Sequence, residues 1–152
     1  TNAKTLARTI VLLRKSQSLK TINEFKAALY PIVKGNPEKY LAKVFQALRI
    51  EVNDELGALK EMLLQVPDIL AEEGRAVFIT FNSLEDRIVK NFFRYGNFEE
   101  QKNESDLYGT PRENILKLIT KKPITPSTQE IKNNARSRSS KLRIAEKKKV
   151  SE

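Results

Sequence analysis

The first part of the chain carries apolar residues at the three- and four-residue spacing of amphipathic helices. Residues 1–16 have this pattern, and Thr21 with Glu24 forms the capping box that begins a helix. We predict that this second helix covers residues 22–33 and ends near Gly35.

Asn36 and Pro37 begin a third helix, because proline is well tolerated at the first helical position. The pattern then predicts one long helix, whose apolar positions are Leu41, Val44, Leu48, Val52, Leu56, Leu59 and Leu63. Pro67 interrupts the pattern, and a short helix is expected between this residue and Gly74.

Residues 76–81, Ala-Val-Phe-Ile-Thr-Phe, form a short β-branched and aromatic run. Apolar residues dominate both faces of this run, as they do in a buried parallel strand. Asn82 and Ser83 follow directly, and Ser83 begins an amphipathic helix that Gly96 stops. Helix, strand, tight turn and helix in this order are typical of an α/β fold.

The remaining sequence predicts a loop, two strands and a short helix. Residues 97–113 are acidic and polar and have no periodicity, so we expect a loop there. Apolar runs predict strands at 114–120 and 140–145. A short helix is expected over residues 125–133, with its cap in the Thr-Pro pair that opens it.

Composition limits the chemistry that this chain can perform. Its 152 residues contain neither Cys nor His, which excludes disulfides, thiolate or imidazole metal sites, and Ser-His or Cys-His catalysis. Residues 1–47 carry nine Lys/Arg and two acids, residues 48–110 seven and thirteen, and residues 111–150 twelve and three. Two basic ends around an acidic centre favour a polyanionic partner, most simply nucleic acid.

Three segments occur in the order and spacing of one protein family. They are residues 45–56 (FQALRIEVNDEL), residues 77–90 (VFITFNSLEDRIVK) followed by two Phe, and residues 122–126 (KPITP) with 134–146 (NARSRSSKLRIAE). Together they resemble the bacterial 16S rRNA (cytosine-N4)-methyltransferases, which modify a cytidine in the ribosomal decoding region. The resemblance runs from about residue 40 to 146, and residues 1–39 are similar to the helical domain inserted in that family.

The resemblance implies an α/β fold class, the C-terminal part of a Rossmann-like S-adenosylmethionine methyltransferase sheet plus an α-helical inserted domain. Residues 1–47 would be part of the inserted domain, residues 48–146 the C-terminal part of the methyltransferase domain, and residues 147–152 a charged tail. The three expected strands would be the fifth and the last two strands of the family. Its first four strands and its glycine-rich cofactor loop have no counterpart here.

The function implied by the resemblance is that of a C-terminal fragment of an enzyme that methylates N4 of a cytidine in 16S rRNA. The cofactor of the full-length protein would be S-adenosylmethionine, bound mostly by the missing N-terminal half. We therefore expect the fragment alone to be inactive. The expected partner is the 16S rRNA of the small ribosomal subunit and the expected location is the cytoplasm, with no membrane and no metal.

Asn82 and Ser83 are the candidate pocket residues, because ligands of open α/β sheets bind at the carboxyl ends of strands. The family typically has His where this chain has Asn82, so a titrating base there is not essential if the sites are equivalent. Methyl transfer from a sulfonium depends mainly on positioning, and the target base must be single-stranded or flipped out. In the alternative interpretation, Ser83 is simply a helix cap paired with Asp86.

Two further groups of residues are candidates for contact with RNA. The first, in a basic and hydroxyl-rich loop, is Arg136, Ser137, Arg138, Ser139 and Lys141; the second, on one face of the third helix, is Gln46, Arg49 and Asn53. The basic residues between positions 4 and 43 form a third surface suited to phosphate: Lys4, Arg8, Lys15, Lys20, Lys26, Lys39 and Lys43. Each is alternatively an ordinary solvated surface. Glu85, Asp86 and Arg87 are expected to make local cap and ion-pair contacts.

Two other functions remain open at this stage. A non-enzymatic basic RNA-binding module accounts for the charge but leaves the three ordered segments as coincidence. A helical protein-interaction domain would use the apolar stripe of residues 41–63, which is more simply explained as core packing. Finally, absence of the family's fourth strand would leave one edge of strand 76–81 unpaired, so a homodimer through that edge is expected.

Overall fold

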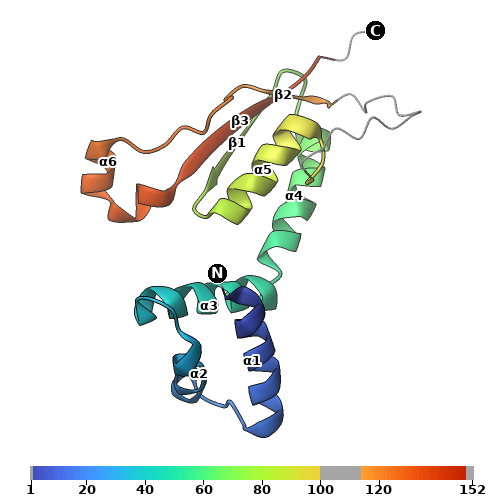
Figure 1. Ribbon diagram of the computed structural model, residues 1–152. Helices are drawn as coiled ribbons and strands as arrows, with labels where there is room; N and C mark the ends of the chain where they lie inside the picture. Colours follow the sequence, from blue (N-terminus) through green and yellow to red (C-terminus); the bar gives the residue numbers. More distant parts are fainter. Residues whose placement is uncertain (1, 100–113, 150–152) are drawn as a thin grey trace. The chain divides into compact units, whose positions relative to one another are not determined.

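The computed structural model describes residues 2–99 and 114–149 (Figure 1). The chain divides into two compact units, a helical unit of residues 1–53 and a sheet unit of residues 54–152. This division falls after Asn53, later in the chain than the predicted one. The assignment of the units to domains of a methyltransferase stays a prediction.

The helical unit is built from short helices with well-formed starts. Its elements are α1 (Ala3–Ser16), α2 (Ile22–Leu29), the 3-10 turn η1 (Tyr30–Ile32) and α3 (Pro37–Val52). The predicted capping box is present, with Thr21 Oγ1 accepting from the Glu24 amide at 3.2 Å and Glu24 Oε2 accepting from the Thr21 amide at 3.1 Å. α2 ends before the predicted residue 33, because the chain tightens into η1 around Pro31, which has no amide hydrogen.

The helical unit has a small apolar core, and hydrogen bonds of Asn2 link the start of α1 to η1 and α3. Its buried apolar residues are Leu29, Leu41 and Val44, and the Phe25 and Phe45 rings lie 5.8 Å apart. Asn2 Nδ2 donates to the Ile32 carbonyl at 2.9 Å, and Asn2 Oδ1 accepts from the Tyr40 hydroxyl at 3.0 Å. The start of α1 is thereby fastened to η1 and α3.

The predicted long helix is two helices, and the prediction was wrong at this point. α3 ends at Val52, and α4 (Glu55–Ile69) begins after Asp54, whose φ of 48° is left-handed. Aspartate tolerates this conformation better than most residues, and the apolar spacing continues across the break. Pro67 lies inside α4, and the short helix expected after it is absent from residues 70–74.

The sheet unit contains a three-stranded sheet. Its remaining elements are β1 (Arg75–Thr80), α5 (Ser83–Tyr95), β2 (Leu116–Leu118), α6 (Thr128–Asn133), the 3-10 turn η2 (Ala135–Ser139) and β3 (Lys141–Lys147). The strand order is β1-β3-β2, and β3 is antiparallel to both neighbours. β1 and β2 therefore run in the same direction but do not pair with each other, and α5 lies between them in the sequence. The parallel pairing predicted for β1 is wrong for this sheet.

Element boundaries in the second half differ from the predicted ones in small ways. The cap of α6 is Ser127, whose hydroxyl accepts from the Glu130 amide at 3.1 Å, not the preceding Thr-Pro pair. β2 is shorter than predicted, and β3 continues through Lys147 into the predicted tail. Most of the loop expected at 97–113 lies outside the described residues.

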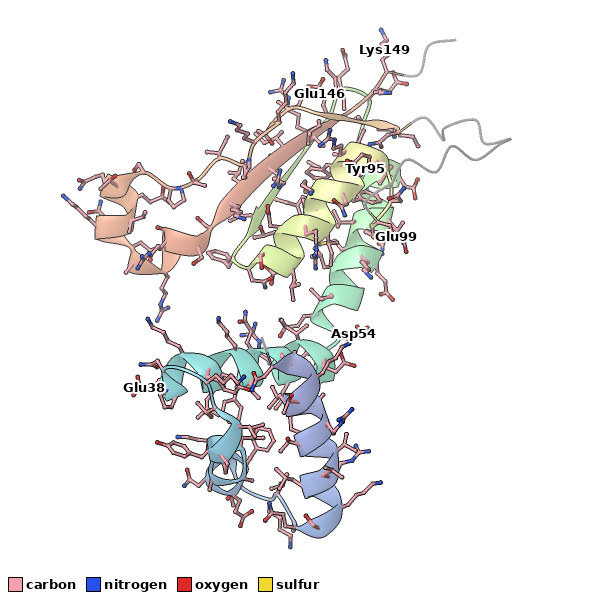
Figure 2. The ribbon with its side chains drawn as sticks, viewed as in Figure 1. Glu38, Asp54, Tyr95, Glu99, Glu146 and Lys149 are labelled. Atoms are coloured by element: carbon pink, nitrogen blue, oxygen red, sulfur yellow. The ribbon has the colours of Figure 1, made fainter. Side chains whose placement is uncertain are left out.

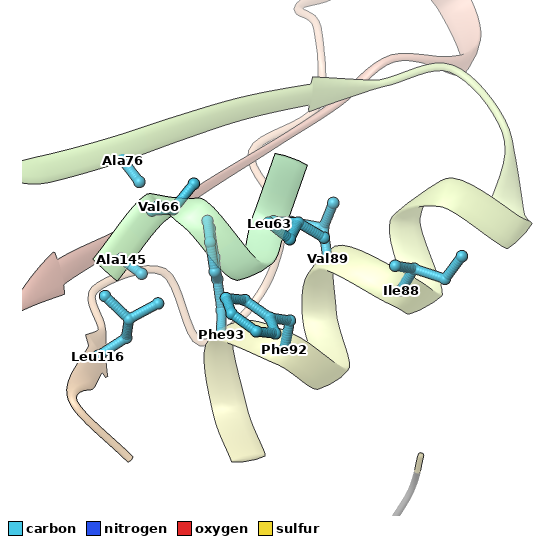
Figure 3. Packing of buried hydrophobic residues seen from close by; sticks show 9 residues of the cluster. All are labelled: Leu63, Val66, Ala76, Ile88, Val89, Phe92, Phe93, Leu116 and Ala145. Carbon is cyan, nitrogen blue, oxygen red and sulfur yellow. The ribbon is translucent and has the colours of Figure 1, made fainter. Parts of the chain in front are cut away.

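Two helices cover one face of the sheet and form the core with it (Figure 3). The core residues are Leu63 and Val66 from α4, Ile88, Val89, Phe92 and Phe93 from α5, and Ala76, Leu116 and Ala145 from the strands. Phe93 is fully buried, and its ring meets that of Phe78 edge-on at 5.5 Å between centroids. The predicted apolar face of α5 is thus the face that packs.

The opposite face of the sheet is apolar and exposed. Val77, Ile79 and Phe81 are 54%, 57% and 57% exposed, while the alternate residues Ala76 and Thr80 are buried. The register places Leu142 and Ile144 of β3 opposite Ile79 and Val77. Among the described residues β1 pairs only with β3, so its outer edge has no strand partner. The prediction that both faces of this strand are buried was wrong, because α4 and α5 pack on the face opposite to Val77 and Ile79.

One buried ion pair links α5 to the central strand. Asp86, in the first turn of α5, is 7% exposed, and Arg143 of β3 is 5% exposed. Asp86 Oδ1 accepts from Arg143 Nε at 2.7 Å, and Oδ2 accepts from Arg143 Nη2 at 3.1 Å. Burial raises the pKa of Asp86, but hydrogen bonds from Arg143 and Lys141 outweigh it and hold this pKa below its ordinary value.

The lowered pKa makes the sheet unit sensitive to acid. A carboxyl group whose folded pKa is depressed stabilises the protein above its unfolded pKa of about 3.9, and this contribution is lost as the pH falls through the folded value. Urea unfolding followed by NMR resonances of the sheet unit should therefore show a loss of stability below about pH 4.

A double variant, Asp86→Leu with Arg143→Met, supplies the control, because it removes both charges and keeps the site filled. Replacement of a whole buried ion pair by apolar residues is often neutral, whereas removal of one partner costs about 3–5 kcal/mol. The double variant should lose less stability in acid than the wild type. Parallel acid profiles for the two proteins would contradict a role for the Asp86 carboxylate.

Candidate functional site

The turn between β1 and α5 is held by two side chains. Asn82 caps the helix, with its Oδ1 accepting from the Leu84 and Glu85 amides, each at 2.9 Å. Asn82 Nδ2 donates to Glu85 Oε1, and Glu85 Oε2 accepts from the Phe81 amide at 3.1 Å. The cap is therefore Asn82 with Glu85, and the alternative that paired Ser83 with Asp86 was wrong.

This arrangement fixes what the two candidate pocket residues present to a ligand. The Asn82 oxygen is occupied by two backbone donors, and one of the two Nδ2 hydrogens is directed to Glu85. The second hydrogen is the group that Asn82 has left to donate. Ser83 is exposed on the first turn of α5.

Lys141, one of the predicted RNA contacts, lies at the same end of the sheet. The register pairs it with Thr80, the last residue of β1, and its Nζ lies 3.1 Å from Asp86 Oδ2. The structure therefore brings Lys141 to the end of the sheet where Asn82 and Ser83 lie, although it is far from them in the sequence. Glu85 makes the local cap contact that was expected, but the ion pair of Asp86 spans 57 residues.

The Asp86–Arg143 pair is the part of this site that the sequence interpretation missed. Arg143 shares a strand face with Lys141 and Ala145, and Ala145 is fully buried against the helices. An arginine two residues from a buried alanine, on the same face of the strand, needs an acidic partner. The position of Arg143 two residues before Ala145 was the available sequence signal for a buried ion pair, although it does not identify Asp86 as the acidic partner.

The segment before β3 exposes most of its predicted contact residues. Arg136, Arg138 and Ser139 are exposed in η2. Ser137 is buried, and its hydroxyl donates to the Asn134 carbonyl at 2.8 Å, so this residue holds the turn together. Residues 119–143 contain seven Lys/Arg and one acidic residue, so the segment that leads into β3 is strongly basic.

The other end of β3 provides a contrast. There Glu146 pairs with Arg75 at 2.9 Å, and Lys149 follows at the end of the described chain (Figure 2). Lys117 of β2 is in register with Glu146 and is exposed. Cations at this end are therefore separated from Lys141 by the length of β3.

The remaining candidate RNA-binding residues belong to the helical unit, and all of them are exposed. Gln46 and Arg49 are exposed on α3, and Asn53 is its exposed C-terminal cap, whose amide donates to the Arg49 carbonyl at 3.0 Å. The predicted basic surface is exposed throughout, at Lys4, Arg8, Lys15, Lys20, Lys26, Lys39 and Lys43.

The described residues offer little that fits a cofactor or a metal. The β1–α5 turn, residues 81–83, contains no glycine, and the side chains of Asn82 and Glu85 fill it. It does not allow the close backbone approach of a glycine-rich cofactor loop. No group of three or more acidic side chains in residues 2–99 and 114–149 is placed to hold a metal ion. Within the same ranges, each helix is too short or too polar to cross a membrane.

Comparison with known proteins places the chain in a family. Residues 1–148 match the sequence model of the MraW methylase family. The chain is 51% identical over 150 residues to the ribosomal RNA small subunit methyltransferase H of Azobacteroides pseudotrichonymphae, covering 96% of this chain and 48% of that protein. Identity is 50% over 143 residues to the protein of the same name from Parabacteroides distasonis, covering 93% and 46%.

A third relative, from Bacteroides thetaiotaomicron, has the same printed name and is 50% identical over 148 residues, covering 97% of this chain and 48% of that protein. The chain thus spans about half the length of the curated relatives that it matches. Because the family match extends over nearly all of its residues, the chain belongs to the MraW methylase family.

Proposed function

We propose that this chain is the C-terminal half of an S-adenosylmethionine-dependent enzyme that methylates N4 of a cytidine in 16S rRNA. The observation that carries the proposal is the family match over residues 1–148, combined with relatives of twice this length that are named for small-subunit rRNA methylation. Such an enzyme acts in the bacterial cytoplasm, where ribosomal subunits are assembled.

In this proposal the sheet unit contributes contacts to the RNA substrate. Arg136, Arg138 and Lys141 bind phosphate oxygens, and the Ser139 hydroxyl adds a neutral donor. The helical unit adds further contacts to the RNA backbone, through Gln46, Arg49, Asn53 and its basic surface. These contacts do not depend on the base sequence of the RNA. A basic RNA-binding module without enzymatic activity would use the same cations, but the family match favours the methyltransferase.

Asn82 and Ser83 are proposed to line the pocket for the flipped-out cytosine. The sulfonium of the cofactor is already a good leaving group, so the protein mainly has to position the target amine. The surplus proton on the amine can leave after methyl transfer, and no titrating base is needed at position 82. The remaining Nδ2 hydrogen of Asn82 and the exposed Ser83 hydroxyl can orient the base by hydrogen bonds.

The methyl donor is expected to bind the half of the protein that this chain does not span. Isothermal titration calorimetry of the 152-residue chain with S-adenosylmethionine should therefore give no binding heat. Tight binding would place the cofactor site within this chain and contradict the proposed division of labour. A full-length relative, titrated in the same buffer, is the positive control.

RNA binding by the chain should be strongly dependent on salt. Each phosphate contact to a single strand contributes about 0.7 to the slope of log affinity against log salt concentration. The double variant Arg136→Gln, Arg138→Gln should lower this slope by about 1.4 when a short cytidine-containing RNA is titrated by fluorescence anisotropy.

The matched control for this experiment is Lys117→Gln, Lys149→Gln, which removes two exposed cations at the far end of β3. Its net charge equals that of the test variant, so a general effect of charge would lower both slopes alike. Equal slopes for the two variants would exclude η2 as the phosphate-binding segment.

We also propose that the isolated chain forms a homodimer through the free edge of β1. An unpaired strand edge next to an apolar face is prone to pair with another chain, and Val77 and Ile79 lie on that face. Analytical ultracentrifugation should show a dimer whose population rises with concentration.

The variant Val77→Lys, Ile79→Lys places two charges on this face and should shift the chain to monomer, because charged residues block edge pairing. Leu64→Lys is the control, since Leu64 is 55% exposed on α4. A wild-type chain that stays monomeric at high concentration would rule the dimer out.

A further inference from the structure

Three charged groups meet at the end of the sheet, and their charges do not cancel. Asp86 supplies one negative charge, and Arg143 and Lys141 each supply one positive charge. The side chains of Asp86 and Arg143 are 10% and 6% exposed, whereas that of Lys141 is 37% exposed. The net positive charge of the cluster is therefore presented at its solvent-facing member.

Lys141 is not required to neutralise the carboxylate. Arg143 already binds both oxygens of Asp86 through Nε and Nη2, and a guanidinium stays protonated throughout the physiological range. The contact of Lys141 Nζ with Oδ2, at 3.1 Å, therefore adds a second cation to a pair that is already balanced. What this contact does supply is a fixed position for the ammonium group.

The fixed position lies next to the candidate pocket. Lys141 is in register with Thr80, two residues before Asn82, and Asp86 belongs to the first turn of α5. The exposed Arg136 and Arg138 precede Lys141 in the chain by a few residues. An ammonium held here adds to the positive end of the α5 dipole, which also favours an anion.

We infer that Asp86 is a positioning residue that holds the Lys141 ammonium to bind a phosphate oxygen of the RNA strand entering the pocket. The inference rests on the proposed function and names the residues that place the strand. Lysine loses rotamer entropy when it is immobilised, and a lysine that is already held loses less of it on binding. Arg143 keeps the carboxylate charged and in place.

The test compares RNA binding by three variants of the 152-residue chain, using the same short cytidine-containing RNA over a range of salt concentrations. Lys141→Gln should lower the salt slope by about 0.7, the loss of one phosphate contact. Asp86→Asn should weaken binding as well, although it removes a negative charge. In the combined variant the two losses should not add, because both changes remove the same contact.

Asp86→Asn is the informative variant, because a purely electrostatic account predicts the opposite sign. Without a positioning role, removal of a carboxylate beside a polyanion site strengthens RNA binding. Asparagine retains an oxygen that accepts from Arg143, and two-dimensional NMR spectra establish whether the sheet unit is folded. If Asp86→Asn does not fold, an unchanged slope in Lys141→Gln, compared with the equal-charge control Lys117→Gln, still overturns the inference.

The outcomes separate this inference from the proposed function. Salt-dependent RNA binding by the wild type with an unchanged slope in Lys141→Gln overturns the inference and removes Lys141 from the proposed phosphate contacts, but leaves the proposed methyltransferase function intact. Lower stability of Lys141→Gln with an unchanged slope overturns it too, and assigns Lys141 a structural role only. Absence of RNA binding by the wild-type chain overturns both.

Discussion

The organisation of the sheet unit depends on the burial of one carboxylate. A charge taken out of water at Asp86 is tolerated only when a cation and its hydrogen bonds replace the lost solvent, and Arg143 provides both. Because Asp86 lies in the first turn of α5 and Arg143 in β3, this requirement fixes the start of the helix over the central strand. The end of β1, the β1–α5 turn and the first residue of β3 are placed by the same constraint.

The sheet unit has two sides with different roles. One side, where α4 and α5 pack on the strands, forms the hydrophobic core and carries the ion pair. The other side exposes the apolar side chains of Val77, Ile79 and Phe81. A sheet covered on one face fits a chain that spans half the length of its relatives.

Sequence periodicity predicted the local elements well because it depends on neighbouring residues. The capping box at Thr21, the apolar face of α5 and the stop at Gly96 follow from short-range chemistry, and the structure contains all three. The break between α3 and α4 was missed because apolar spacing continues past Asp54, where the backbone reverses its handedness.

The candidate site could be predicted only in part, since its geometry depends on contacts distant in sequence. Asn82 was found from its place after a strand, but its role as the helix cap depends on a backbone conformation that spacing alone does not specify. The pairing of Asp86 with Arg143 depends on strand order, because β3 must lie beside β1 before the two residues meet. Ser137 looked like a surface hydroxyl in a basic segment, yet it is buried by the turn that it stabilises.

The strand order also has a consequence for how the protein is made. β3 is the last of the three strands along the chain, but it is the central one, and β1 and β2 have no contact with each other without it. Chains are synthesised from the N-terminus and non-local strand pairing is slow, so the edge of β1 that pairs with β3 stays unpaired until β3 has been made. Synthesis that ended before residue 141 would give a chain in which β1 and β2 cannot join into this sheet, while the helical unit, complete by residue 53, has already been made.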